Sequence, residues 1–182
     1  MRGIPPGRDQ EWLEALFDLH ATTVRAYAIR RVGHDAADDV VSEVFATAWR
    51  RRGAVAEPAL PWLLRTAHHV VAHEKRSLAR RLNVRDAVAG VAAGPSGPGA
   101  DSASRVLAES VLAQLAPTDA EILRLAAWEE LTPAEIAVVL DLSDSATRSR
   151  LMRARKRAQK LLAEPSAAPS LRVVPQLQGD LS

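Results

Sequence analysis

The chain has 182 residues, a mass of 19.7 kDa and 47% hydrophobic residues, which is enough for one ordinary domain or two small ones. It contains no cysteine, which excludes a disulfide framework, a thiolate nucleophile and a cysteine zinc site. The net charge is only +2, so a surface for nucleic acid would have to come from charge gathered on one face.

Residues 1–8 are predicted to be a disordered lead-in, and they lack the apolar core of a signal peptide. No apolar run in the chain approaches the roughly 20 residues that are needed to cross a bilayer. We therefore expect no membrane insertion, and the absence of cysteine suits a reducing cytoplasm. Strand-like alternation is hard to find and only 4% of the residues are aromatic, so we expect an all-α fold.

The first predicted helix covers residues 9–32 and ends at Gly33. Its apolar residues recur at helical spacing: Leu13, Leu16, Phe17, Val24, Tyr27 and Ala28. A second helix, which Asp35 can cap, follows as far as a group of arginines whose charges suit the negative end of the helix dipole. Its apolar stripe consists of Ala37, Val40, Val41, Val44, Phe45 and Ala48.

Residues 54–61 include two prolines and are predicted to form a loop. A third helix then runs from Trp62 to about residue 82. Its apolar side carries Leu63, Leu64, Ala67, Val70 and Val71. Its exposed side carries cations and histidines: Arg65, His68, His69, Lys75, Arg76, Arg80 and Arg81.

His69 and His73 lie four residues apart on this third helix, a spacing at which two histidines can share a metal ion. No glutamate directly follows the first histidine, and no third ligand is evident. We therefore expect no metal site and a solvent-facing or DNA-facing position for both rings.

Between residues 83 and 104 the composition changes to Ala, Gly, Pro and Ser, which is typical of a flexible linker and a domain boundary. A segment of about 22 residues spans at most about 75 Å when fully extended, which exceeds two turns of B-DNA at about 34 Å each. The sequence therefore predicts two small helical domains, residues 9–82 and 105–164, that can reach well-separated segments of DNA.

The second domain is predicted to begin with helices at residues 105–115 and 118–128 and to precede a disordered tail, residues 165–182. Thr118 and Glu121 have the spacing of a capping box at the start of the second of these helices. The helices at residues 105–115 and 118–128, together with the two helices described next, predict a four-helix domain.

Residues 131–162 have the pattern of two helices joined by a tight turn. A capping box of Thr132 and Glu135 opens the first helix. Asp141 lies in the turn, where aspartate tolerates a left-handed backbone better than most residues. Ser143 can cap the following helix.

The second helix of this pair is strongly basic. Its apolar side carries Thr147, Leu151, Ala154, Ala158 and Leu161. From Ser143 to Lys160 the only acid is Asp144, against seven arginines and lysines. This is the helix-turn-helix pattern, whose second helix enters the major groove of DNA. A basic helix face can also be a merely solvated surface, so periodicity and charge favour DNA binding without establishing it.

The segment from about residue 112 to residue 162 resembles, without gaps, the region 4 domain of bacterial sigma factors of the extracytoplasmic function (ECF) group. The markers are Leu115, Pro117, Leu123, Trp128, Ala134, Glu135, Ile136, Ala137, Ser143, Arg148, Ser149, Arg150, Arg153 and Arg155. In that family this domain binds the minus 35 promoter element. The resemblance implies minus 35 contacts from Ser145, Arg148, Ser149, Met152 and Arg153.

The amino-terminal half is similar to region 2 of the same family, over residues 38–52 and 61–76. In the family the first segment docks on the clamp helices of the polymerase β′ subunit, and the second reads and opens the minus 10 element. The resemblance implies docking by Asp39, Ser42 and Glu43. It implies minus 10 contacts from Trp62, Arg65, His68, His69 and Arg76.

The resemblance thus implies an ECF-type sigma factor, a dissociable subunit that directs promoter-specific transcription initiation. The implied partners are core RNA polymerase, through its β′ clamp helices and β subunit, promoter DNA and an anti-sigma factor. We expect no catalytic residue and no cofactor. The competing interpretation is a stand-alone helix-turn-helix regulator that binds operators as a dimer, and residues 38–52 argue against it. The sequence does not support a hydrolase or a metalloenzyme, because it contains no glycine-rich phosphate loop, no nucleophile motif and no cluster of metal ligands.

Overall fold

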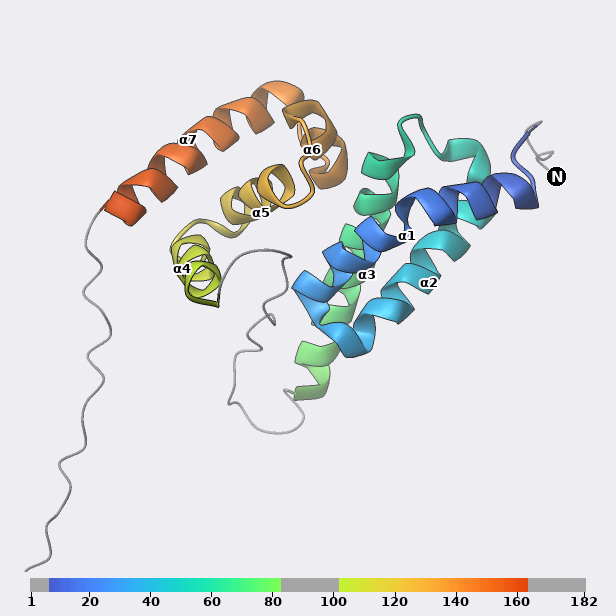
Figure 1. Cartoon of the computed structure of the whole chain (residues 1–182), viewed down its shortest axis with the longest axis horizontal. Helices are drawn as coiled ribbons and strands as arrows, with labels where there is room; N and C mark the ends of the chain where they lie inside the picture. The colour runs from blue at the N-terminus through green and yellow to red at the C-terminus, as the bar shows by residue number, and fades with distance from the viewer. Residues whose placement is uncertain (1–6, 83–101, 164–182) are drawn as a thin grey trace, which may run out of the picture.

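The computed structural model describes residues 7–82 and 102–163, and over these ranges it consists of helices and connecting turns (Figure 1). Residues 1–6, 83–101 and 164–182, which contain most of the predicted lead-in, linker and tail, lie outside the described residues. The expected all-α fold is confirmed. The elements are α1 (Gln10–Val32), α2 (His34–Arg50), the short 3₁₀ helix η1 (Arg52–Ala54), α3 (Ala59–Leu82), α4 (Ser102–Ala113), α5 (Pro117–Ala127), α6 (Pro133–Leu140) and α7 (Asp144–Ala163).

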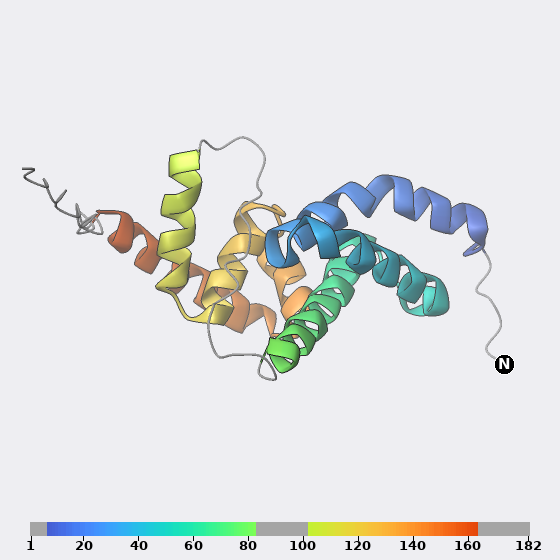
Figure 2. The same cartoon turned by 90° about the horizontal axis from the view of Figure 1, so that it is seen from below.

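Helices α1, α2 and α3 pack together as a three-helix bundle (Figures 1 and 2). Asp9 caps α1 by accepting a hydrogen bond from the backbone N–H of Trp12 at 3.2 Å. Gly33 ends α1 with a φ of 83°, which side chains disfavour, and the chain turns directly into α2. The fully buried side chains of this bundle include Val24, Tyr27, Val40, Val44, Leu63 and Leu64.

Two helix starts in this bundle differ from the prediction. Helix α2 begins at His34, so Asp35 lies within its first turn instead of capping it. Helix α3 begins at Ala59, before the predicted start at Trp62, and contains Pro61 in its first turn. Proline is tolerated there because the first-turn N–H groups have no partner within the helix.

The predicted helix-turn-helix is present as α6, a tight turn and α7. The Thr132 hydroxyl accepts a hydrogen bond from the Glu135 N–H at 3.3 Å, and the Glu135 carboxylate accepts one from the Thr132 N–H at 2.8 Å. Asp141 has a left-handed backbone with a φ of 55°. The Ser143 hydroxyl accepts a hydrogen bond from the Ala146 N–H at 3.2 Å. The predicted capping box, turn and second cap are therefore confirmed.

Two other helix starts in this half differ from the prediction. Helix α4 already begins at Ser102, inside the predicted linker. In α5, Pro117 takes the first helical position and no side chain caps the helix, so the predicted capping role of Thr118 is wrong. Glu121, the other half of that predicted box, instead forms an ion pair with Arg31 of α1 at 2.8 Å.

The two halves of the chain pack on each other (Figure 2). Helix α6 contacts α3, and a single apolar cluster continues from the α1–α3 bundle into the second half. Its members there are Ile122, Leu125, Leu131, Ile136, Val139 and Leu151. A smaller cluster of Leu112, Leu115 and Ala120 lies around α4 and α5. The sequence predicts a core for each half, but not this contact between them.

Candidate nucleic-acid interface

Helix α7 is buried on one side and exposed on the side that the sequence assigned to DNA. Thr147, Leu151 and Ala154 face the protein interior with at most 4% of each residue exposed. The five residues that the resemblance assigned to the minus 35 element are all exposed: Ser145, Arg148, Ser149, Met152 and Arg153. Met152, a large apolar side chain, is 68% exposed. The helix therefore presents cations, hydroxyls and an apolar group together, as base and phosphate recognition requires.

The cations of α7 differ in what they contact. Arg148 forms an ion pair with Asp144 one turn earlier, its Nε lying 3.1 Å from a carboxylate oxygen. Arg150 and Arg157 instead reach Asp119 of α5 at 3.2 and 3.4 Å. Asp119 is buried, so these two pairs fasten α7 to α5. The sequence interpretation missed this role, because the basic run gives no sign of which cations pair with a neighbouring helix.

Helix α3 carries the residues assigned to the minus 10 element, and they differ in exposure. Trp62 and His68 are half-buried, whereas Arg65, His69 and Arg76 are exposed, so the predicted exposed position of His68 is wrong. The His68 ring nitrogen Nδ1 lies 3.3 Å from the hydroxyl of the buried Tyr27. Burial lowers the pKa of His68, so its ring contributes hydrogen bonding and not positive charge near neutral pH.

Arg65 and His69 of α3 both contact Asp141 in the turn before α7. The Arg65 guanidinium lies 2.5 Å from one carboxylate oxygen of Asp141. The His69 Nε2 lies 3.5 Å from the other. The structure therefore joins the segment assigned to the minus 10 element to the helix-turn-helix. The sequence interpretation did not predict this contact.

The residues assigned to polymerase docking lie together on the exposed side of α2: Asp39, Ser42 and Glu43. Glu43 accepts hydrogen bonds from Arg50 at 2.6 Å and from Thr47 at 3.2 Å. These hydrogen bonds, with that from Arg50 the stronger, lower the pKa of Glu43, so its carboxylate is charged at neutral pH. Asp39 and Glu43 also line a shallow hollow between α2 and α3.

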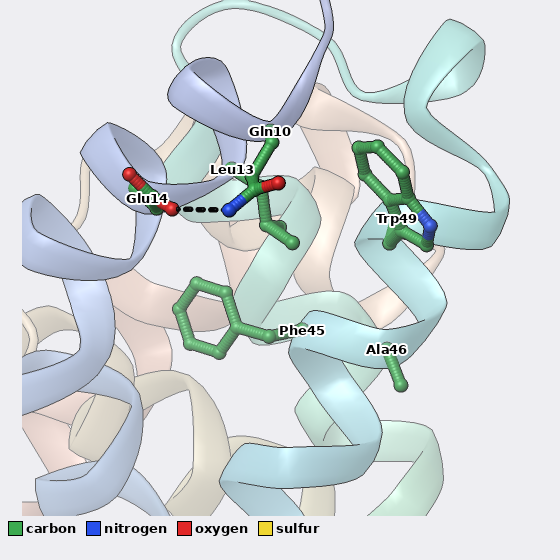
Figure 3. Close-up of a pocket in the computed structure, with 6 residues that line it drawn as sticks. All are labelled: Gln10, Leu13, Glu14, Phe45, Ala46 and Trp49. Atoms are coloured by element: carbon green, nitrogen blue, oxygen red, sulfur yellow. Dashed lines mark hydrogen bonds between the residues drawn. The ribbon is translucent and has the colours of Figure 1, made fainter.

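An apolar pocket lies between the first half of α1 and the end of α2 (Figure 3). Its lining consists of Gln10, Leu13, Glu14, Phe45, Ala46 and Trp49. The ring of Phe45 packs 4.8 Å from that of Phe17, which remains 45% exposed, and Trp49 is 36% exposed. In Figure 3, Phe45 and Trp49 bound this pocket from two sides. The sequence interpretation did not single it out, although exposed aromatic residues in a chain with only 4% aromatics would have been a usable signal.

A buried group of charges joins α1 to the second half of the chain. Arg30 lies 2.5 Å from Glu129, and Arg31 lies 2.8 Å from Glu121 and 3.3 Å from Glu129. The guanidinium of Arg31 also stacks 3.5 Å from the ring centroid of Tyr27. The Arg30, Arg31 and Glu129 side chains are at most 6% exposed. We call Arg30, Arg31, Glu121 and Glu129 the buried charge cluster.

Within the described parts of the chain, no group of three or more His, Cys, Asp or Glu side chains could hold a metal ion. The same ranges contain no helix that is both long enough and apolar enough to span a membrane.

Two family models match the chain, one on each half. Sigma-70 region 2 matches residues 16–81, and Sigma-70, region 4 matches residues 105–157. The ECF RNA polymerase sigma factor SigL of Mycobacterium tuberculosis is 31% identical over 145 residues, which cover 76% of this chain and 82% of that protein. The probable RNA polymerase sigma factor RfaY of Xanthomonas campestris is 33% identical over 131 residues, covering 66% of this chain and 32% of that protein.

Solved structures share the fold. The sigma factor RpoE from Bartonella quintana, in complex with the anti-sigma factor NepR, aligns with a TM-score of 0.65 and 22% identity over 85% of this chain and 99% of its own. CnrH, in complex with the cytosolic domain of CnrY, aligns with a TM-score of 0.60 and 25% identity over 87% of this chain and 92% of its own.

Proposed function

Because the chain belongs to the ECF group of RNA polymerase sigma factors, we propose that it directs promoter-specific transcription initiation through three surfaces on α2, α3 and α7. Sigma factors are transcription initiation factors, and we assign this chain no catalytic residue. It works with core polymerase and promoter DNA in the cytoplasm. The observation that carries the proposal is the exposed row of five residues on α7, which follows a helix-turn-helix turn of the predicted geometry.

Helix α7 reads the minus 35 element in the major groove. Ser145, Arg148 and Ser149 lie in its first two turns, where residues of a recognition helix reach base edges. Arg153 lies further along, next to the exposed Lys156, and both can contact phosphate. Arg150 and Arg157 do not belong to this set, because both are held by Asp119.

Helix α3 binds the minus 10 element. Arg65, His69 and Arg76 supply an exposed polar face that can follow a DNA backbone. Trp62 is half-buried and offers part of an aromatic surface to an unstacked base. His68 supports this helix from within through its contact with Tyr27.

Helix α2 docks on the clamp helices of the polymerase β′ subunit through Asp39, Ser42 and Glu43. The two carboxylates confer orientation and association rate, as exposed charges at interfaces generally do. The apolar pocket between α1 and α2 adds affinity, because aromatic groups such as Phe45 and Trp49 can be covered by a partner.

An anti-sigma factor is the remaining partner in the proposal. RpoE and CnrH were each solved with a bound protein, the anti-sigma factor NepR and the cytosolic domain of CnrY. We infer that this chain has an inhibitor of its own that covers the docking and DNA-binding surfaces. A pull-down with the full chain should recover a protein that core polymerase displaces.

Assembly with core RNA polymerase tests the proposed function. The full chain, mixed with core polymerase that lacks a sigma factor, should co-elute with it and enable initiation from the promoter of a regulated operon. A dimer that binds operator DNA without polymerase, and never associates with the core enzyme, would support the competing helix-turn-helix regulator instead.

A further inference from the structure

A pocket of about 440 Å³ lies between the two halves of the chain. Its lining comes from α1 and α3 of the first half and from α5, α6 and the turn after α6 in the second. A pocket of this size suits a small molecule. Its polar lining consists of Arg31, His68, Lys75, Thr118, Glu121 and Arg124.

The charged side chains of this pocket carry an excess of positive charge. Arg31, Lys75 and Arg124 contribute three cations, whereas Glu121 is the one acid among the described residues that line it. Glu121 lies 2.8 Å from Arg31 and 4.0 Å from Arg124. A single carboxylate therefore faces three cations, and the pocket favours a further anion.

Lys75 is the cation of the pocket that has no acidic partner. Arg31 and Arg124 each have a second acid, Glu129 at 3.3 Å and Glu109 at 3.0 Å. Lys75 makes no ion pair with a described residue. Partial burial lowers the pKa of Lys75, and the two arginines lower it further, against the opposing effect of the nearby acid on α5. An anion bound beside Lys75 would offset both of these costs.

The N-terminus of α5 opens on the same pocket through Pro117 and Thr118. No side chain caps this helix, so the backbone N–H of Thr118 has no partner within the helix. Such N–H groups, at the positive end of the helix dipole, favour an anion. Asp119 in the same turn pairs with Arg150 and Arg157 of α7. The Thr118 hydroxyl is a further donor at the pocket.

A second observation points to a ligand independently of the helix N-terminus. The Arg31 side chain is only 5% exposed, and its Nη2 atom makes no hydrogen bond to a described residue. That atom lies 2.8 Å from Glu121, but its N–H bonds are not aligned with the carboxylate. A buried donor without an acceptor is unfavourable. Arg31 lines the pocket, where an anionic oxygen would supply the missing acceptor.

We propose that this pocket binds the phosphate groups of a small phosphorylated molecule through Lys75, Thr118 and Arg31. Phosphate suits the pocket because its oxygens accept several charge-assisted hydrogen bonds at once. The three residues come from α3, α5 and α1, so the bound molecule stabilises the packing of the two halves. The site goes beyond the proposed function, since neither promoter DNA nor polymerase is needed to fill it.

Calorimetric titration of the full-length chain with inorganic pyrophosphate, at constant ionic strength, tests the site. Lys75→Gln should weaken pyrophosphate binding about tenfold, the usual effect of losing one hydrogen bond between charged groups. Lys75→Arg should retain most of the binding, because it keeps the positive charge. Lys156→Gln is the matched control, since it removes the same charge from an exposed position of α7 outside the pocket.

A second variant places a negative charge inside the pocket. Thr118→Glu should abolish pyrophosphate binding and leave the chain folded, because its carboxylate repels the ligand and suits the first turn of a helix. Its control is Thr22→Glu, the same substitution at an exposed position of α1. Circular dichroism checks the fold of every variant. Pyrophosphate should also raise the melting temperature of the unsubstituted chain above that in sodium chloride of equal ionic strength.

Three results would overturn the inference. One is the absence of binding to the unsubstituted chain at millimolar pyrophosphate. Another is an equal loss in Lys75→Gln and Lys156→Gln, which would place the anion on the basic surface of α7. The third is equal binding by Thr118→Glu and Thr22→Glu. A chain that binds pyrophosphate as expected but never assembles with core polymerase would refute the proposed function and leave the site standing.

Discussion

The arginines of α7 divide into groups by what each side chain touches. Arg150 and Arg157 pair with the buried Asp119 of α5, so their guanidinium groups fasten α7 to α5 although both side chains remain partly exposed. Arg148 is aligned by Asp144 along the exposed side. In the described part of the chain Arg153 and Lys156 make no ion pair, so both are available for nucleic acid.

We predict that Arg148→Ala and Lys156→Ala weaken promoter binding in different ways. Replacing a base-reading arginine by alanine should weaken binding to the cognate minus 35 sequence by about 1 to 3 kcal/mol and relax the base preference at one position. Replacing a phosphate-contacting lysine by alanine should weaken binding to cognate and scrambled duplexes equally. It should also reduce the slope of log binding constant against log salt concentration by about one unit. Anisotropy of the polymerase holoenzyme on both duplexes, over a range of salt, measures this. Equal losses on both duplexes for Arg148→Ala would mean that it only grips the backbone.

We predict that the double variant Asp39→Ala, Glu43→Ala assembles less well with core polymerase and keeps its fold, because both acids are exposed and lie off the buried stripe of α2. The matched control is Asp35→Ala with Asp38→Ala, which removes two exposed acids of the same helix that the docking proposal does not use. Helicity and polymerase binding are measured together. Unchanged binding in the first variant, or equal loss in both, would show that the docking surface lies elsewhere.

At the scale of elements, two threonines with the same capping-box spacing behave differently. Thr132 and Glu135 form both bonds of the box at the start of α6. Thr118 and Glu121 do not, because Pro117 already takes the first helical position and Glu121 is drawn to Arg31. The spacing alone therefore predicts a possible box, and a tertiary ion pair decides whether it forms.

This contrast leads to a stability prediction. Thr132→Ala should lower the free energy of unfolding by about 1 kcal/mol, the usual cost of losing a helix cap. Thr118→Ala should change it by less than about 0.5 kcal/mol, as is normal for an exposed site without a special contact. Urea unfolding followed by circular dichroism compares the two. A cost at Thr118 as large as that at Thr132 would contradict the assignment of the caps.

At the scale of the whole molecule, the contact between the halves adds apolar packing to the buried charge cluster. Helix α6 is only eight residues long, and its buried side chains Ile136 and Val139 belong to the cluster that continues into the α1–α3 bundle. The α4–α7 half nonetheless has contacts of its own, since α7 packs on α4, α5 and α6. It should fold alone, with part of its stabilisation missing.

We predict that the isolated segment 102–163 is helical but melts at a lower temperature than the full chain. For a domain of this size, each kcal/mol of lost packing lowers the melting temperature by roughly 4 to 8 °C. Thermal melts by circular dichroism on both proteins provide the comparison. A segment without helical structure would show that the two halves form one folding unit, and an equal melting temperature would show that the contact adds no stability.

Much of the fold and of the candidate site could be predicted from the sequence, because the signals are local. Helical stripes, the Thr132 capping box and the left-handed turn at Asp141 each depend on residues within a few positions of one another. The exposed row on α7 follows from the same periodicity, since burying Leu151 and Ala154 turns Met152 and Arg153 outward. The resemblance to ECF sigma factors, carried by such local patterns, identified the family that the comparisons then showed.

The sequence by itself thus determined the helical fold, most of the buried faces and the family, whereas the tertiary structure decided where several helices begin and which charges on different helices meet. Arg30 and Glu129 are 99 positions apart, and the sequence around either residue does not predict that they pair. The same holds for Arg65 and Asp141, which are 76 positions apart. The local sequence around a charged residue on a helix is the same whether that residue contacts water, DNA or another helix. Its role is decided by packing, which places some of these charges out of reach of water.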